Sequence, residues 1–375
     1  MTEPSLRVLL LLGRSAGGIG THVADLRHQL SGLGARVEVA TDDSTAAAFG
    51  WAEARRLWPG AAGVAASAHR LSALRHWCAS TDIVHAHGHQ AGVLAAALRA
   101  TLAPAGRRRG QPALVISLHN ELPPLTTAAA RAIARASAAA VRSADLVTGA
   151  SSDLVAWARD SGARRAQLAE VPSPRVPELL AAGTKQREEA RRGIRAELGL
   201  APGAPLAATI SRVAPQKDLG TLIAASALLP EVAWVVAGAG DAPLLARARE
   251  QAHEQGAPVR FLGAVANPAR LLLAADMFVL TSRWEARALV VQEAMAAGTP
   301  VVASAVGGIP DLLGDVGTLV PPGDPHAVVV AVAGLLADPR AAAGQAHRGR
   351  ALAARWPDGR QAARRWLAAY AELLA

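Results

Sequence analysis

The sequence predicts an α/β protein with two doubly wound domains. Short apolar runs alternate with helix-prone segments, this alternation occurs in two successive series, and the proline-rich stretch Pro172–Pro177 separates the series. Strands that alternate with helices form parallel sheets with right-handed crossovers. We therefore expect a first domain at residues 1–175, a second at residues 176–355 and a last helix at residues 356–375.

The expected strands are short and mostly apolar, as in parallel sheets that helices cover on both faces. In the first domain they are Arg7–Leu12, Arg36–Ala40, Asp82–Ala86, Ala113–Leu118, Asp145–Gly149 and Leu168–Val171. In the second they are Leu206–Ser211, Ala233–Ala237, Val259–Leu262, Met277–Thr281, Val301–Ser304 and Thr318–Val320.

Three helices are also expected from pattern. Thr184–Leu198 is charged and amphipathic, and Leu289–Ala297 is helix-prone and ends at Gly298. The last helix, which ends near Leu374, carries a row of apolar side chains that could pack back on the first domain or only on the second.

Composition narrows the class of protein. The chain has 375 residues, of which 51% are hydrophobic, and its mean hydropathy of +0.21 excludes a disordered protein. Cys78 is the single cysteine, which excludes an internal disulfide and suits the cytoplasm. No segment approaches the ~18 uninterrupted apolar residues of a transmembrane helix, so none is expected.

The formal charge of +9 suggests nucleic-acid binding as one function to consider. We discount it, because the excess arginines are scattered over alanine-rich helices without interleaved aromatic residues or a zinc-finger signature. Solvated helix faces and a loop explain the arginine clusters more simply than peripheral contact with anionic lipids at the inner face of a membrane. The clusters are Arg107–Arg109, Arg131/Arg135/Arg142 and Arg187/Arg191/Arg192/Arg195.

Two glutamates follow the strand Met277–Thr281. Glu285 lies in the expected loop, and Glu293 lies about one turn into the helix after it. Beyond the carboxyl end of a parallel strand, this spacing directs both carboxylates and the free N–H groups of Leu289 and Val290 into one crevice. Such N–H groups bind phosphate, and carboxylates accept hydrogen bonds from sugar hydroxyls.

Two cations follow the first strand of the second domain. Arg212 and Lys217 lie at the edge where open sheets bind ligands, and the chain has only one other lysine, Lys185. A diphosphate leaving group needs positive charge where its negative charge grows, and two cations supply it without a metal.

Glycines and a histidine complete the candidate set. Gly17 and Gly18 lie between the first strand and a helix, and Gly238 and Leu262 lie near strand ends of the second domain. Glycine allows close approach to a phosphate, although such turns are often scaffold. His119 directly follows the expected strand Ala113–Leu118. Three roles are open to it: a general base, a hydrogen-bond partner for a hydroxyl group, or an ordinary loop residue.

A metal site is not expected. His85, His87 and His89 alternate along the chain, but no carboxylate or cysteine accompanies them. The chain also has no Asp-x-Asp pair, which weakens the case for a metal-dependent transferase.

Glu285-x7-Glu293, Arg212-x4-Lys217 and the glycine loop at Gly17–Gly18 together resemble the motifs of retaining glycosyltransferases of the GT-B type, especially family 4. The resemblance implies two Rossmann-like domains facing a cleft, with the last helix crossing back to the first domain. It also implies transfer of a sugar from a UDP- or GDP-linked donor to a hydroxyl of a small-molecule or lipid-linked acceptor, with retention and without a cofactor.

The resemblance also implies roles. Glu293 would bind the ribose, Glu285 the donor sugar, and Arg212 with Lys217 the diphosphate. Gly18 would lie on the phosphate side, and His119 would meet the donor sugar or the acceptor. In the front-face mechanism favoured for such enzymes, the departing phosphate takes the acceptor proton, so no protein nucleophile is needed.

The chain departs from the family in two places. Ala286-Arg287-Ala288 stands where Gly-Phe-Pro is usual, so an arginine enters the loop next to the sugar. Val171-Pro-Ser-Pro-Arg-Val replaces the usual Pro-Asn-Gly-Val-Asp, which puts domain closure in doubt.

Other functions fit the same fold. A catalytically silent nucleotide-sugar-binding protein would bind a donor without turnover, and a sugar-nucleotide epimerase would convert a donor without an acceptor. Nucleic-acid binding would weaken steeply with salt.

Overall fold

The computed structural model describes residues 5–15, 17–56, 63–102, 111–201 and 203–375. It divides into two compact units, unit 1 with Met1–Val171 and Gly359–Ala375, and unit 2 with Pro172–Asp358. Each unit holds one parallel sheet with helices between successive strands, which is the α/β class that the sequence predicts.

The sheet of unit 1 has seven strands in the order β3-β2-β1-β4-β5-β6-β7. Its strands are β1 (Arg7–Leu12), β2 (Arg36–Thr41), β3 (Arg55–Arg56), β4 (Ile83–His87), β5 (Ala113–Leu118), β6 (Leu146–Gly149) and β7 (Ala166–Leu168). Its helices are α1 (Gly18–Gly32), α2 (Asp43–Ala48), α3 (Gly63–Ala79), α4 (His89–Leu102), α5 (Ala128–Ser143), α6 (Ser152–Asp160) and α16 (Gly359–Leu374). β1 is central and apolar, and its pairing with β2 and β4 is parallel.

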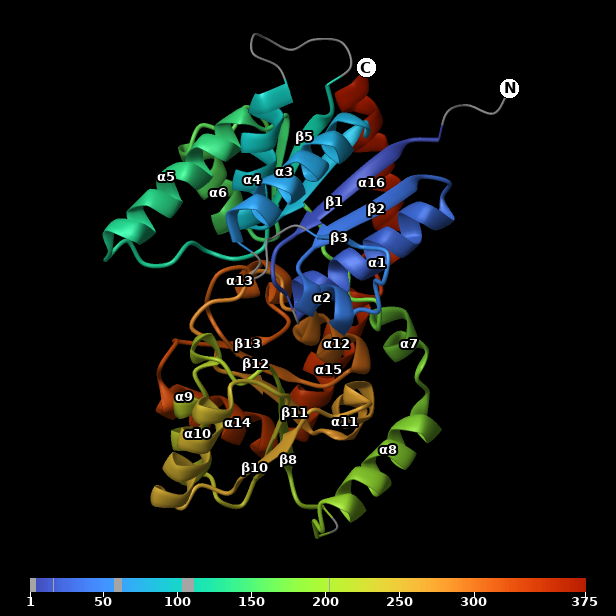
Figure 1. Cartoon of the computed structure of the whole chain (residues 1–375). Coiled ribbons are helices and arrows are strands. Elements are labelled where there is room, and N and C mark those ends of the chain that lie inside the picture. The colour runs from blue at the N-terminus through green and yellow to red at the C-terminus, as the bar shows by residue number, and fades with distance from the viewer. Residues whose placement is uncertain (1–4, 16, 57–62, 103–110, 202) are drawn as a thin grey trace. The chain divides into compact units, whose positions relative to one another are not determined.

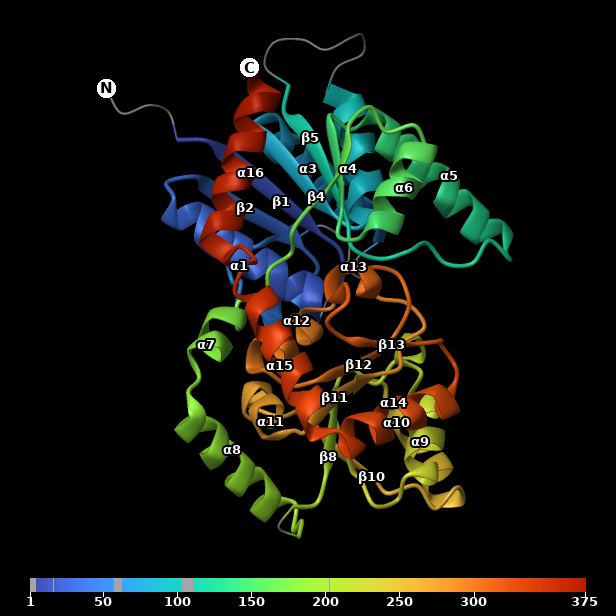
Figure 2. The same ribbon diagram turned by 180° about the vertical axis from the view of Figure 1, so that it is seen from behind.

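Helices cover both faces of this sheet. α16 lies beside α1 on one face, and α3 and α4 lie on the other (Figures 1 and 2). Ala363, Trp366 and Tyr370 of α16 are buried in the same hydrophobic core as Leu10 of β1 and Leu30 of α1. The end of the chain therefore completes the core of the unit in which the chain begins.

The sheet of unit 2 has six strands in the order β10-β9-β8-β11-β12-β13. Its strands are β8 (Leu206–Ile210), β9 (Ala233–Ala237), β10 (Val259–Gly263), β11 (Met277–Leu280), β12 (Val301–Ser304) and β13 (Thr318–Val320). Its helices are α7 (Val176–Ala181), α8 (Thr184–Glu197), η1 (Pro215–Lys217), α9 (Leu219–Leu228), α10 (Ala242–Glu254), α11 (Pro268–Ala274), α12 (Leu289–Ala297), α13 (Ile309–Leu313), α14 (Pro325–Ala337) and α15 (Pro339–Ala353).

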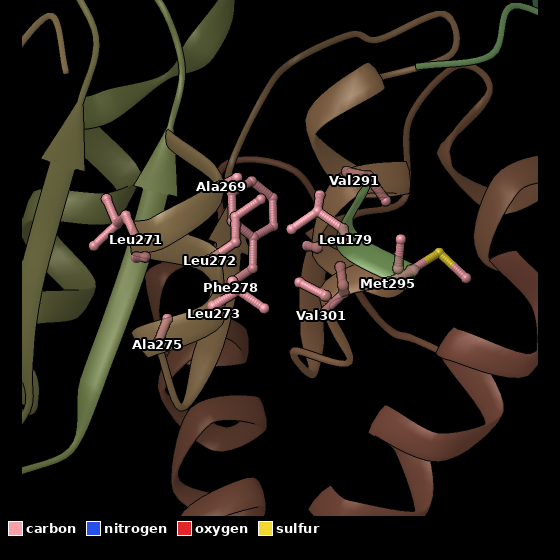
Figure 3. Packing of buried hydrophobic residues seen from close by; sticks show 14 of the residues in the cluster. Leu179, Ala269, Leu271, Leu272, Leu273, Ala275, Phe278, Val291, Met295 and Val301 are labelled. Atoms are coloured by element: carbon pink, nitrogen blue, oxygen red, sulfur yellow. The ribbon is translucent and has the colours of Figure 1, made fainter. Parts of the chain in front are cut away.

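The larger core of unit 2 joins β11 and β12 to the helices around them. Phe278 of β11 packs among Leu272 of α11, Leu179 of α7 and Val291 of α12, all of them almost fully buried (Figure 3). Burial of such side chains contributes roughly 1.5–3 kcal/mol each. This packing fixes the start of α12, and with it the position of Glu293.

Apart from shifts of one residue at the ends of several elements, three details differ from the sequence-based expectation. The strand β3 is an addition, two arginines long, which no apolar pattern marks. β7 ends at Leu168, where the expected strand began. Pro172–Pro177 was expected to stop regular structure, yet α7 begins at Val176, because a proline in the first helical turn has no N–H to lose and a suitable φ.

Some arginines of the three clusters already form ion pairs within the protein. Arg191 and Arg195 of α8 form ion pairs with Asp276, at 2.5 and 2.7 Å. Arg131, Arg135 and Arg142 lie along α5. Arg107–Arg109 lie outside the described residues.

No single helix in the described ranges has the length and apolar character to cross a membrane; α14 and α15 meet that test only as a pair, and they are bent by 102° to each other.

Candidate active site

Glu285 is held in the loop between β11 and α12. The residue is 6% exposed, and its Oε1 accepts hydrogen bonds from Lys217 Nζ at 2.5 Å and from Ser282 Oγ at 2.6 Å. The Gly308 N–H donates to the Glu285 carbonyl oxygen at 2.8 Å. Gly307 has φ +50°, and a Cβ there would overlap the same oxygen. The turn at Gly307 and Gly308, which directly precedes α13, therefore also fixes the backbone of Glu285.

Lys217 lies in η1, which is tied to the Glu285 loop by backbone and side-chain hydrogen bonds. The Arg283 N–H donates to the Gln216 carbonyl oxygen at 2.8 Å, and Gln216 Nε2 donates to the Trp284 carbonyl oxygen at 2.5 Å. The Lys217–Glu285 pair is thus set by a rigid connection between two loops.

Asp218 follows Lys217 in the left-handed conformation, with φ 45° and ψ 53°. Among the described residues it is the one non-glycine residue with positive φ. Its Oδ2 accepts a hydrogen bond from Thr221 Oγ1 at 2.9 Å, and its carbonyl oxygen accepts one from Thr281 Oγ1 at 3.1 Å. Backbone strain of this kind gathers at functional sites, where the surrounding structure holds it in place.

Glu293 lies in α12 with a second set of partners. It is 3% exposed, and its Oε1 accepts hydrogen bonds from Ser173 Oγ at 2.6 Å and from Arg175 at 3.3 Å. Burial raises the pKa of Glu293, and the bonds from Ser173 and Arg175 partly offset that rise. Both partners belong to the segment that departs from the family motif, so the departure supplies new contacts to this carboxylate.

The two carboxylates share one arrangement. In each, Oε1 is occupied by protein donors, whereas Oε2 makes no hydrogen bond to any residue that the structure describes. A carboxylate oxygen in this state can accept hydrogen bonds from the hydroxyl groups of a ligand.

The remaining candidates of unit 2 lie on the neighbouring loops. Arg212 is exposed and forms no ion pair or hydrogen bond within the described part of the chain. Gly238 has φ +149°, and a Cβ there would overlap the Ser211 carbonyl oxygen, so glycine is needed for the loops after β8 and β9 to meet. Leu262 is 37% exposed at the end of β10.

The first turn of α12 also lacks a capping side chain. Leu289 and Val290 are half-buried, the N-cap is Ala288, and no side chain caps the helix. Arg287, which was expected to enter the sugar-proximal loop, has its guanidinium 5.8 Å from the ring centre of Trp356.

His119 belongs to unit 1, in a cluster of buried histidines. Its Nε2 and Nδ1 of His87 share a hydrogen bond at 3.0 Å, and its ring centre lies 5.5 Å from that of His22. Burial lowers the pKa of His119 to about 3 and that of His22 to about 4, so both are neutral near pH 7. A base this weak is poorly matched to proton abstraction at neutral pH. Of the roles left open for His119, hydrogen bonding to a hydroxyl fits best.

A second polar chain starts from His85. Its Nδ1 and the Tyr370 hydroxyl lie 2.7 Å apart, its Nε2 and Ser117 Oγ lie 2.7 Å apart, and Ser117 Oγ lies 2.7 Å from Thr148 Oγ1. All four side chains are buried. This chain of hydrogen bonds connects α16 to β4, β5 and β6.

His22, His87 and His119 are also the candidate metal ligands in the described ranges, with ligand atoms within 4.8 Å of one another. This set differs from the His85, His87 and His89 row that the sequence raises, because His89 opens α4 and its Nε2 bonds to the Asn120 carbonyl oxygen at 3.0 Å. The hydrogen bond between His87 and His119 already explains their closeness, so the spacing alone does not indicate an ion.

The glycine loop of unit 1 precedes α1. Gly17 is the N-cap and, as a glycine, has no side chain with which to cap the helix, and Gly18 is the exposed first helical residue. Ser15 Oγ accepts a hydrogen bond from the Gly20 N–H at 3.0 Å. The N–H groups of Gly18 and Ile19 at the start of the helix, together with the helix dipole, suit an anion.

Sequence reasoning did not find Ser173, Ser282 or His22. Ser173 and Glu293 are 120 residues apart, and no local pattern pairs them. Ser282 lies three residues before Glu285, and His22 follows the glycine loop, so their positions beside recognised motifs were the available signals.

Two family models match the chain. "Glycosyl transferases group 1" matches residues 190–351, and "Glycosyl transferase 4-like domain" matches residues 17–174. The matched ranges cover most of both units and include every candidate residue named above.

Curated relatives match over part of the chain. D-inositol 3-phosphate glycosyltransferase of Mycolicibacterium paratuberculosis is 40% identical over 162 residues, which are 41% of this chain and 37% of that protein. Alpha-maltose-1-phosphate synthase of Mycolicibacterium smegmatis is 38% identical over 129 residues, 32% of this chain and 33% of that one. The matches thus span about a third of each curated relative.

The fold matches solved structures over nearly its full length. HepE of Anabaena, in complex with UDP and glucose, has a TM-score of 0.83 at 22% identity, over 98% of this chain and 100% of that one. Sucrose-phosphate synthase of Thermosynechococcus elongatus has a TM-score of 0.77 at 22% identity, over 98% and 99%. With both family models and this fold, the chain belongs to the GT-B glycosyltransferases of the family 4 type.

Proposed function

We propose that the protein is a retaining glycosyltransferase that moves a sugar from a nucleoside diphosphate sugar to an acceptor hydroxyl without a metal ion. The observation that carries this proposal is the pair of buried carboxylates in unit 2, Glu285 and Glu293, each with one oxygen free to accept hydrogen bonds. Glu293 would receive the ribose hydroxyls, and Glu285 the hydroxyls of the donor sugar.

Two cations on the loops of unit 2, Arg212 and Lys217, support binding of a diphosphate at this site. Arg212 has no partner among the described residues, and Lys217 is anchored on Glu285. Positive groups fixed where negative charge develops stabilise a departing diphosphate, and they do so more strongly in a partly buried site than in water. The HepE structure was solved with UDP and glucose, which makes UDP the first nucleotide to test.

The proposed reaction is a front-face substitution. The bond between the anomeric carbon and the β-phosphate oxygen breaks, the acceptor oxygen bonds to the same face of that carbon, and the acceptor proton passes to the departing phosphate oxygen. No protein nucleophile takes part. His119, neutral because of its burial, would hold a hydroxyl by hydrogen bonding. A cytoplasmic location is part of the proposal.

The test is a thermal-shift panel of UDP, GDP, ADP and their common sugar conjugates, with a chelator present. A ligand at 100 times its dissociation constant stabilises by about 2.7 kcal/mol, which moves the midpoint by a few degrees. Glu293→Gln is the informative variant, because it keeps an acceptor for Ser173 and turns the free oxygen into a donor. Glu250→Gln, on the exposed side of α10, is the matched control.

We expect one nucleotide to shift the wild type and the control, and its affinity to fall about 10-fold or more in Glu293→Gln, since a charged hydrogen bond contributes about 1.5–3 kcal/mol. A folded wild type that no nucleotide stabilises would overturn the donor site. Binding without transfer to any acceptor would favour the silent binding protein, and conversion of the donor alone would favour the epimerase.

A further inference from the structure

Three histidines of unit 1 come together from separate parts of the chain. His87 is the last residue of β4, His119 directly follows β5, and His22 lies near the start of α1, the helix that follows β1. The strands β1, β4 and β5 are neighbours in the sheet, so the three side chains meet at one carboxyl edge. Each offers a nitrogen within 4.8 Å of those of the other two.

Two nitrogens of this cluster have no partner. His22 Nδ1 and His87 Nε2 are buried, and neither makes a hydrogen bond to a residue that the structure describes. The hydrogen bond between His87 Nδ1 and His119 Nε2 explains why those two rings are close, but it satisfies neither of these atoms. Buried polar atoms are rarely left without partners, which indicates a ligand or a water molecule at this point.

His85 shows that a buried histidine of β4 can be fully paired within the protein. Its ring centre lies 4.1 Å from that of His87, yet its two nitrogens lie within hydrogen-bond distance of Tyr370 and Ser117. The unpaired nitrogen of His87 is therefore not a general consequence of burying a histidine on this strand.

Three neutral imidazoles are a ligand set for a transition metal. Burial lowers the pKa of each of the three, so each is neutral near pH 7 and keeps one nitrogen lone pair. Imidazole suits Zn²⁺, Cu²⁺ and Ni²⁺, whereas Mg²⁺ and Ca²⁺ prefer oxygen. Among the described residues the group contains no carboxylate, so an open fourth position would be left for water.

The spacing of the nitrogens is compatible with such an ion. In a tetrahedral site with Zn–N bonds of about 2.0–2.1 Å, the ligand nitrogens lie roughly 3.3 Å apart. The bonded nitrogens of His87 and His119 are 3.0 Å apart, and the whole group lies within 4.8 Å. Modest rotation of the rings therefore closes the group around an ion.

We propose that His22, His87 and His119 bind a divalent transition-metal ion such as Zn²⁺ through their ring nitrogens, with a water molecule as the fourth ligand. The transfer reaction proposed above uses no metal, and the ion would engage His119, which that reaction uses to hold a hydroxyl group. The metal would therefore inhibit transfer. This inhibition rests on the proposed function, whereas the metal binding does not.

The probe is Co²⁺, because a four-coordinate Co²⁺ ion absorbs visible light much more strongly than the hydrated six-coordinate ion. It is titrated into the full-length protein after a chelator has been added and removed. We expect the visible band of a four-coordinate ion. Zn²⁺ should abolish this band, since it accepts four ligands without a geometric penalty, whereas Mg²⁺ should not.

Two variants of α1 separate this cluster from the other histidines of the chain. His22→Phe keeps an aromatic ring against those of His87 and His119 and removes an unpaired nitrogen, so it should fold, but it lacks one of the three ligands. We expect its affinity for Co²⁺ to fall at least about 100-fold. His28→Phe, at an exposed position of the same helix, is the matched control and should bind Co²⁺ like the wild type.

Three results would overturn the inference: no such band with millimolar Co²⁺, a band that Mg²⁺ removes as readily as Zn²⁺, or equal affinities of the His22 and His28 variants. The first is measured on the wild type alone, so it decides the matter even if a variant does not fold.

Nucleotide thermal shifts in the presence of a chelator report on the proposed function separately. A protein that binds UDP or GDP but not Co²⁺ would keep its donor site and lose only this metal site. A protein that binds Co²⁺ but no nucleotide would keep the metal site and lose the proposed function.

Discussion

Asp218 combines a left-handed backbone with a place next to Lys217. Glycine adopts this conformation freely, whereas alanine pays roughly 1–2 kcal/mol. We therefore expect Asp218→Ala to be less stable than Asp218→Gly by about 1 kcal/mol, the reverse of the usual order within a helix. Both variants lose the hydrogen bond to Thr221, so their difference isolates the backbone. Urea denaturation of both proteins measures it, and equal stabilities would show that the backbone is unstrained.

Glu293 should illustrate a conflict between stability and binding. Burial raises its pKa, so the charged form is disfavoured in the folded protein, and stability falls as the pH rises through the folded-state pKa. Glu293→Gln has no charge to bury. The free energy of unfolding of this variant, measured relative to wild type, should increase as the pH rises from about 4.5 to neutrality. The same variant should bind the nucleotide more weakly than wild type. Urea titrations at several pH values check this, and a difference that does not change with pH would contradict it.

At the residue scale, sequence reasoning located positions but not partners. The pattern places Glu285 in a loop and Glu293 in a helix, and the structure has both there. The contact between Lys217 and Glu285 joins loops 68 residues apart, and no spacing within either loop specifies it. Their roles toward a donor stay predictions.

At the scale of elements, one buried hydrogen bond helps to hold α16 against the sheet of unit 1. The Tyr370 hydroxyl is the partner of His85 Nδ1, and Tyr370→Phe would leave that nitrogen without one. An unsatisfied buried group costs about 1–3 kcal/mol, so we expect a loss of that size. Leu374→Ala, at an exposed position on the same helix, is the control and should change little. Thermal unfolding of both variants tests this, and equal midpoints would contradict it.

Most strands could be predicted because buried parallel strands are continuous apolar runs. Arg7–Leu12, Ala113–Leu118, Ala233–Ala237, Val301–Ser304 and Thr318–Val320 occur with the expected bounds. The edge strand β3 could not be predicted, since two arginines carry no apolar pattern; they pair with β2 through the backbone, and Arg55 also bonds to Glu38 of that strand at 3.3 Å. α7 escaped prediction because Pro177 signals both a break and the first turn of a helix.

At the scale of the whole molecule, the two units should respond differently to acid. The buried histidines His22, His85, His87 and His119 all have lowered pKa values and belong to unit 1. The unfolded chain takes up protons on them below about pH 6.5, whereas in the folded unit the pKa is lowered to about 4 for His22 and about 3 for His119, and burial also lowers those of His85 and His87. Between these pH values, each such histidine lowers the free energy of unfolding by about 1.4 kcal/mol for every unit by which the pH falls.

Unit 1 should therefore lose stability first as the pH falls from 6.5 toward 4. Hydrogen exchange at pH 7 and pH 5 measures this by peptide, once the intrinsic rate change is removed. We expect protection to fall in β4 and β5 more than in β8 and β11. An equal fall in both units would show that the histidine cluster does not govern acid sensitivity.

The position of α16 also sets an order of events during synthesis. Unit 2 is one continuous segment, whereas unit 1 needs Gly359–Ala375 to close its core over Leu10 and Leu30. On the ribosome, residues 172–358 emerge before those last residues do. The half of the protein that is translated first is therefore the last to finish folding, and until then its apolar surface remains open to chaperones.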